Sequence, residues 1–134
     1  MRTAPGDPQV LAIVERAYRG ALEKQYADCL YLAAELHRQM GGMDIVLRGL
    51  SVTYAARRAH VPPLVLGGRL VDTLTDPRAD VRVLLDAGVR VYAEEQGVRA
   101  YGLAGEGSLL DGVRTISTLD VAARWSDYRL VCFL

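Results

Sequence analysis

The chain has 134 residues and carries 16 Lys and Arg residues against 16 Asp and Glu residues, so its formal net charge is zero. Proteins that hold nucleic acid backbones need a basic surface and a high pI, whereas the pI here is about 6.7, and nucleic acid is therefore not an expected partner. No apolar run reaches the ~20 residues of a membrane-spanning helix, and residues 1–9 lack the apolar stretch of a secretory signal. We expect a cytoplasmic protein that has no membrane partner.

Short Val-rich apolar runs alternate with segments of helical period, a pattern typical of βαβ units and a parallel sheet. We expect one α/β domain over residues 1–134, with about five strands, helices on both faces of the sheet, and flexible residues 1–8. The expected strands are residues 10–14, 43–47, 89–93, a short segment within 109–116, and 130–133. The expected helices are residues 26–40, a short helix that follows Ser51 and ends before Pro62, residues 77–87, about 94–102, and 118–125.

Local sequence patterns give further detail on these elements. Asp76 before Pro77 is the expected N-cap of one helix, and Ser117 with Asp120 three residues later resembles a capping box. Residues 64–70 fit a small hairpin around two glycines about as well as a loop. We expect the first strand to lie inside the sheet, with other strands on both sides of it.

The carboxyl ends of parallel strands are where ligands bind in open α/β sheets. We therefore consider residues 15–19, 48–54, 94–97 and 116–118 first. Side chains in and near these segments form the candidate ligand-binding set: Tyr18, Tyr54, Arg57, Glu94 and Glu95. The two glutamates have two interpretations, since a carboxylate in a first helical turn is favoured by the helix dipole and one in a cleft can act as a general base.

Other motifs predict little chemistry. The two histidines, His37 and His60, fit no metal-binding pattern, and Gly102, Gly105 and Gly107 follow a helix, whereas a phosphate loop links a strand to the next helix. We expect no metal site and no cofactor. The two cysteines, Cys29 and Cys132, have no metal-ligand or CxxC spacing, and we expect both to be reduced thiols that pack in the core.

The segment of residues 84–103, LLDAGVRVYAEEQGVRAYGL, resembles the stretch that the DsrE/DsrF-like sulfur-relay family places around its reactive cysteine. In that family a helix ends in Gly-Val, a strand follows, and the cysteine opens the next helix, which ends at a glycine. Gly88, Val89, Glu94 and Gly102 reproduce this frame. The order of elements agrees over nearly the whole chain, including the segments MDIVLRG and LLDGVRTI.

The resemblance implies a DsrE-like fold with flavodoxin-like layering, a homo-oligomer (trimer or hexamer), and a sulfur-relay partner protein or a small-molecule ligand. It also places Glu94, or Glu95 if the alignment moves by one, where the family has its cysteine. A carboxylate cannot hold a transferable sulfane sulfur. The chain therefore resembles members without the reactive cysteine, which implies a non-catalytic subunit or a binding protein in sulfur-related metabolism. Apolar residues near the C-terminus are the expected subunit contact: Trp125, Phe133 and Leu134.

Two alternatives stay open, and with them the question of enzymatic activity. The first is an enzyme, either a sulfurtransferase or sulfur carrier that uses Cys132, or a cleft enzyme that uses Glu94 as general base. The second is a purely structural homo-oligomer. A buried Glu94 in a pocket favours the cleft enzyme, an exposed Glu94 that caps its helix favours the binding or the purely structural role, and a solvent-open Cys132 favours sulfur transfer.

Overall fold

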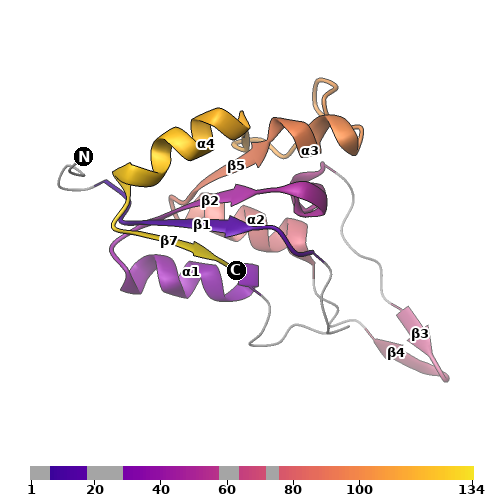
Figure 1. Ribbon diagram of the computed structural model, residues 1–134. Helices are drawn as coiled ribbons and strands as arrows, with labels where there is room; N and C mark the ends of the chain where they lie inside the picture. Colours follow the sequence, from indigo (N-terminus) through magenta and orange to yellow (C-terminus); the bar gives the residue numbers. More distant parts are fainter. Residues whose placement is uncertain (1–6, 18–28, 58–63, 72–75) are drawn as a thin grey trace.

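A five-stranded parallel sheet is the centre of the computed structural model, which describes residues 7–17, 29–57, 64–71 and 76–134 (Figure 1). The strand order is β6-β5-β2-β1-β7, and every neighbouring pair in this sheet is parallel. The strands are β1 (Val10–Val14), β2 (Met43–Leu47), β5 (Arg90–Glu94), β6 (Arg114–Ile116) and β7 (Leu130–Phe133). The α/β fold class expected from the sequence is confirmed, and β1 lies inside the sheet between β2 and β7. The expected flexibility of the N-terminus concerns mainly residues 1–6, which lie outside the described residues.

Helices cover both faces of this sheet. Figure 1 shows α1 (Cys29–Gln39) and α2 (Pro77–Asp86) on one face and α4 (Thr118–Arg124) on the other, while α3 (Glu95–Ala100) continues directly from β5. Every residue of β1 and β2 is buried, because central parallel strands are covered on both sides. In the described part of the chain, no helix combines the length and the apolar character needed to cross a membrane.

Both predicted N-caps are present, although only the serine half of the capping box at Ser117 is formed. The Asp76 side chain accepts hydrogen bonds from the backbone N–H groups of Arg78 (3.2 Å) and Ala79 (3.4 Å) at the start of α2. The Ser117 hydroxyl accepts the N–H of Asp120 at 3.1 Å. Helices α2 and α4 each end one residue earlier than predicted, and residues 125–127 form the 3₁₀ turn η2 (Trp125–Asp127). Helix α3 is shorter than the predicted range of about 94–102. Of the predicted helix 26–40, residues 26–28 lie outside the described part.

The short helix expected after Ser51 is wrong in its type and its start. The structure has a 3₁₀ helix, η1 (Gly49–Ala55), with Arg48 at its N-cap. The Ser51 hydroxyl accepts the Arg48 N–H at 2.9 Å and donates to the Val14 carbonyl at 2.5 Å, so it connects η1 to the end of β1. This long-range bond explains the difference, because it draws Ser51 into the first turn of the helix. Arg57 lies beyond the end of η1.

The hairpin at residues 64–71 is confirmed as a two-stranded antiparallel sheet of its own, β3 (Leu64–Leu66) and β4 (Arg69–Val71) (Figure 1). Its turn residues have positive φ, 54° at Gly67 and 78° at Gly68. A two-residue turn with this backbone matches the twist of the flanking strands and strongly favours glycine.

A fully buried carboxylate connects three elements on the face that α4 covers. Asp44 in β2 is 0% exposed and accepts hydrogen bonds from Arg90 Nε (2.9 Å), Arg90 Nη2 (2.8 Å) and the Tyr128 hydroxyl (2.5 Å). Burial and the hydrogen bond to Asp44 raise the pKa of Tyr128, so its hydroxyl stays protonated and donates. Nearby, Arg124 lies over the Tyr92 ring at 4.9 Å and donates to its hydroxyl at 3.0 Å.

We predict that Asp44→Asn lowers the free energy of unfolding by about 2–4 kcal/mol. The amide has one acceptor oxygen instead of two and carries no charge, so it leaves part of the Arg90 and Tyr128 donor set without a partner. Chemical denaturation at neutral pH measures this change. The matched control is Asp86→Asn at the exposed end of α2, which should change stability by less than about 0.5 kcal/mol. Equal effects for the two variants would show that the Asp44 contacts do not stabilise the fold.

Candidate functional site

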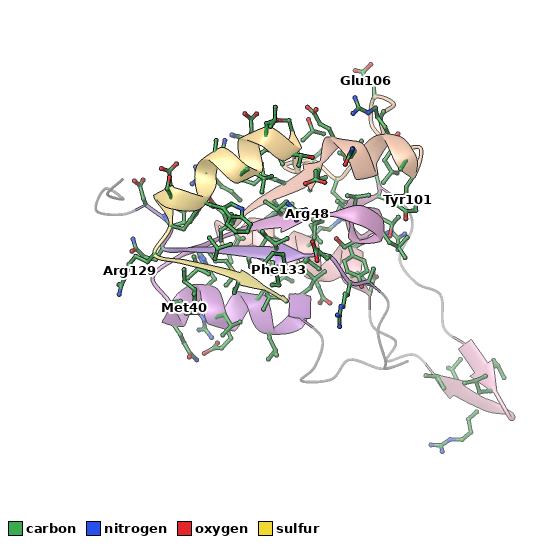
Figure 2. All side chains as sticks on the ribbon, viewed as in Figure 1. Met40, Arg48, Tyr101, Glu106, Arg129 and Phe133 are labelled. Atoms are coloured by element: carbon green, nitrogen blue, oxygen red, sulfur yellow. The ribbon has the colours of Figure 1, made fainter. Side chains whose placement is uncertain are left out.

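Three charged residues lie side by side at the carboxyl edge of the sheet. Glu15 directly follows β1, Arg48 directly follows β2, and Glu94 is the last residue of β5. These strands are neighbours and end in register, so the three side chains start from adjacent positions. Figure 2 shows Arg48 at the end of β2. This is the edge at which ligands bind in sheets of this class.

Arg48 forms ion pairs with both glutamates. Its Nε donates to Glu94 Oε2 at 3.0 Å, and its Nη1 donates to Glu15 Oε1 at 3.1 Å. The Glu94 side chain is only 5% exposed, whereas that of Glu15 is 48% exposed. Burial opposes the charge on Arg48, but its hydrogen bonds and ion pairs with the two carboxylates outweigh burial and raise its pKa. The guanidinium therefore stays positive beside the buried Glu94 carboxylate.

The side chains of Glu94 and Glu95 have different surroundings. Glu94 occupies the N-cap position of α3, but its side chain makes no capping hydrogen bond and pairs with Arg48 instead. Glu95 is exposed in the first turn of α3, where the helix dipole favours a carboxylate. The dipole interpretation therefore suits Glu95, whereas Glu94 is held by an ion pair.

A close contact fixes α3 against η1. A Cβ atom on Gly97 would lie 2.8 Å from Val52 Cγ1 and 3.0 Å from the Gly49 carbonyl oxygen, so this position in α3 has space only for glycine. Gly97 and Val98 are both buried. The contact sets the position of the helix that carries Glu95 and Arg99.

An open depression of about 530 Å³ lies beside α3 and the loop of residues 103–113. Figure 2 shows Tyr101 and Glu106 at this end of the molecule. The residues that matter for its chemistry are Arg57, Glu95, Val98, Arg99, Asp111 and Thr115; we call it the α3 depression. Its loop is held by backbone bonds to the segment after η1, from the Arg57 N–H to the Ser108 carbonyl (2.8 Å) and from the Leu110 N–H to the Ala55 carbonyl (2.8 Å).

The predicted ligand-binding residues do not form one site. Arg57 and Glu95 line the α3 depression, whereas Glu94 does not. Tyr54 is only 7% exposed and packs in the larger hydrophobic cluster, and Tyr18 lies outside the described residues. The strand ends were predicted to within one residue, but no sequence pattern singles out Arg48, whose partner Glu94 is 46 residues away. Sequence reasoning also missed Arg99 and the loop of residues 103–113, because the glycines there were considered only as a phosphate loop.

Cys132 lies in β7, away from the carboxyl-edge cluster. It pairs with Ala12 of β1, and both β1 and β2 lie between its strand and β5. The thiol is free, half-buried and packed against the larger cluster. Burial raises the pKa of Cys132, which is the opposite of what a reactive thiolate needs. Cys29 begins α1, and its side chain lies outside the description.

Metal ligands are not assembled in the described residues. No group of three or more His, Cys, Asp and Glu side chains there is arranged to hold a metal ion. His37 Nδ1 accepts a hydrogen bond from the backbone N–H of Met43 at 3.0 Å, and this bond connects α1 to β2. His60 lies outside the described residues.

We predict a strong energetic coupling between Arg48 and Glu94. In a double-mutant cycle with Arg48→Gln and Glu94→Gln, the two losses of stability should exceed the loss in the double variant by about 1–3 kcal/mol, because each single change leaves a buried group without its partner. The control cycle uses Glu15→Gln in place of Glu94→Gln. The exposed ion pair between Arg48 and Glu15 should give a coupling of at most about 1 kcal/mol. Denaturant unfolding measures both cycles, and equal couplings would contradict the prediction.

Comparisons with known proteins identify structures but no family. No protein-family model and no curated protein matches the sequence. The crystal structure of the YchN protein from E. coli is similar with a TM-score of 0.73 and 17% sequence identity, over 96% of this chain and 100% of that one. MTH1491 from Methanobacterium thermoautotrophicum, a protein of unknown function, is similar with a TM-score of 0.61 and 19% identity, over 94% of this chain and 99% of that one. At these identities the likeness shows that this chain has the same fold as both proteins.

Proposed function

We propose that this protein is a DsrE-like member of the sulfur-relay family without the reactive thiol, and that it acts in the cytoplasm as a non-catalytic subunit or as a ligand- or partner-binding protein in sulfur-related metabolism. The observation that carries the proposal is the burial of Glu94 and its ion pair with Arg48. At the strand-to-helix junction where the resembling family has its cysteine, this chain has a buried carboxylate paired with Arg48.

The chemistry at that junction argues against sulfur transfer. Sulfur carriers hold a sulfane sulfur on a thiolate, and a helix N-terminus or a neighbouring cation lowers the pKa of that thiol. Here Arg48, the cation at the junction, is used by the carboxylates of Glu94 and Glu15. Among the described residues no cation pairs with the half-buried Cys132, and burial raises its pKa. These features make Cys132 a poor replacement for the family's cysteine.

A cleft enzyme that uses Glu94 has less support. A general base must come within hydrogen-bond reach of the proton that it removes. Glu94 is buried but does not line the α3 depression, and its Oε2 accepts from Arg48. Burial of the Glu94 carboxylate agrees with the enzyme hypothesis, but the ion pair with Arg48 also accounts for that burial.

Assembly into a homo-oligomer, a trimer or a hexamer, belongs to the proposal. Two aromatic residues near the edge strand β7 support it: Trp125 is 41% exposed, Phe133 is 54% exposed, and their rings meet edge to face at 6.3 Å between centroids. Aromatic residues are enriched in subunit interfaces. Phe133 lies on β7 in Figure 2. Leu134, which the sequence also suggested for the contact, is partly buried against the larger cluster of its own chain.

The test of the proposed function is treatment with a persulfide donor. We expect intact-mass and peptide mass spectrometry to find no added sulfur on Cys132 in the Cys29→Ser variant, because the thiol is half-buried and protonated. A thiol persulfide-forming protein treated in parallel is the positive control. Stable addition of one sulfur atom to Cys132 would overturn the proposal in favour of a relocated sulfur carrier.

A second measurement checks the physical reason. Because the pKa of Cys132 is raised, its thiolate forms at higher pH than that of an ordinary cysteine, and its alkylation by iodoacetamide should increase only at higher pH than alkylation of glutathione. If Cys132 is alkylated at lower pH than glutathione, its thiol is activated.

We predict that Phe133→Ser weakens the homo-oligomer, because a polar residue replaces the aromatic one in the proposed contact. Sedimentation velocity should show the wild type as an oligomer and should shift the variant toward the monomer, with a dissociation constant at least about tenfold larger. The control Val83→Ser changes an equally exposed apolar side chain on α2 and should leave the assembly unchanged. A monomeric wild type would contradict the assembly.

A further inference from the structure

The α3 depression has the size of a small-molecule site. Its volume of about 530 Å³ falls within the range of ligand pockets. Apolar side chains from α3 and from the following loop contribute to its surface, among them Val98, Leu103 and Val113. Charged side chains and a threonine stand beside them. The lining therefore mixes polar and apolar surface, and it offers a small ligand both charged groups and an apolar patch.

The charges that line the depression balance. Arg57 and Arg99 contribute two guanidinium groups, and Glu95 and Asp111 contribute two carboxylates, so the net formal charge is zero. Nη2 of Arg57 is bound to Asp111, and its Nε donates to the Leu109 carbonyl at 3.3 Å. This pair neutralises itself. A net anion or a net cation therefore gains little from the overall field of the depression.

The other two charges are available. Among the residues that the structure describes, neither Glu95 nor Arg99 makes an ion pair or a side-chain hydrogen bond. They lie four positions apart on α3, a spacing that places two side chains on the same face of a helix. Val98, which is 4% exposed, lies between them in the sequence and also lines the depression. A free carboxylate and a free guanidinium thus border one apolar surface.

We propose that the α3 depression binds a small zwitterion with an apolar side chain, the chemistry of an apolar α-amino acid or a short apolar peptide. The ligand's carboxylate binds the Arg99 guanidinium, its ammonium group binds Glu95, and its apolar part covers Val98 and the neighbouring leucines. The proposal names the ligand class for the binding role proposed above and rests on that role. Zwitterions fit better than singly charged ligands because both unpaired charges receive a partner.

The experiment is a titration of the full-length ¹⁵N-labelled protein followed by NMR. The probes are L-leucine, the dipeptide Leu-Leu, and two analogues that each lack one charge, 4-methylpentanoate and 3-methylbutylamine. We expect L-leucine or Leu-Leu to shift the amide signals of Arg99, Gly105 and Thr115, with a dissociation constant of about 1 mM or lower. Each singly charged analogue should bind at least about tenfold more weakly. The two zwitterions distinguish a free amino acid from a peptide as the natural ligand.

Variants test the roles of the two charges. Arg99→Gln and Glu95→Gln should each weaken binding of the zwitterion about tenfold. Arg82→Gln, at an exposed position of α2 outside the depression, should leave it unchanged. A dispersed amide spectrum shows that each variant is folded.

Either of two results would overturn the inference. One is the absence of shifts around the depression with both zwitterions at about 10 mM, and the other is equal binding of L-leucine and 4-methylpentanoate. The persulfide experiment is independent of these titrations. If neither zwitterion binds and Cys132 takes up no sulfur, only the proposed ligand class is wrong. If Cys132 takes up sulfur, the proposed function is wrong.

Discussion

The buried carboxylate of Glu94 imposes the main constraint on the carboxyl edge of the sheet. Removing a charge from water costs several kcal/mol unless a partner compensates it, and Arg48 is that partner. The backbone N–H of Arg48 is held by the Ser51 hydroxyl, which also donates to the Val14 carbonyl. A single run of hydrogen bonds thus connects the ends of β1, β2 and β5. The start of η1 and the entry into α3 depend on this arrangement.

The strands were predictable where the sequence contains a short, uninterrupted apolar run. Residues 10–14, 43–47 and 130–133 have the predicted bounds; the first two are buried on both faces and therefore contain uninterrupted apolar runs. The strand expected at 89–93 lies one residue later, because Glu94 still pairs with Ile116 of β6. Such a pairing depends on the neighbouring strand and has no local pattern. The start predicted for the helix after Ser51 was wrong for a similar reason, because the serine hydroxyl donates a hydrogen bond to the Val14 carbonyl of β1.

The site was predictable in position but not in its pairings. Parallel strands end at a common edge, so the segments after each strand were correct places to search, and they contain Glu15, Arg48 and Glu94. Which side chains meet depends on strand order and on the direction of each side chain. The adjacent residues Glu94 and Glu95 belong to different surroundings, and Tyr54 packs in the core. The proposed role of Arg99 was not predicted, because an arginine on a helix has no sequence pattern that separates a ligand contact from solvated surface.

The contact between Gly97 and η1 has a consequence for binding energetics. Because there is no space for a Cβ atom at this position, the backbone of α3 lies directly on Val52 and on the Gly49 carbonyl. Val52 and the Gly49 carbonyl therefore limit how much closer α3 can come to η1. The Cα positions of Glu95 and Arg99 are therefore set before any ligand arrives, and only their side-chain rotamers become ordered on binding. For the proposed zwitterionic ligand, such preorganisation lowers the entropic cost of association.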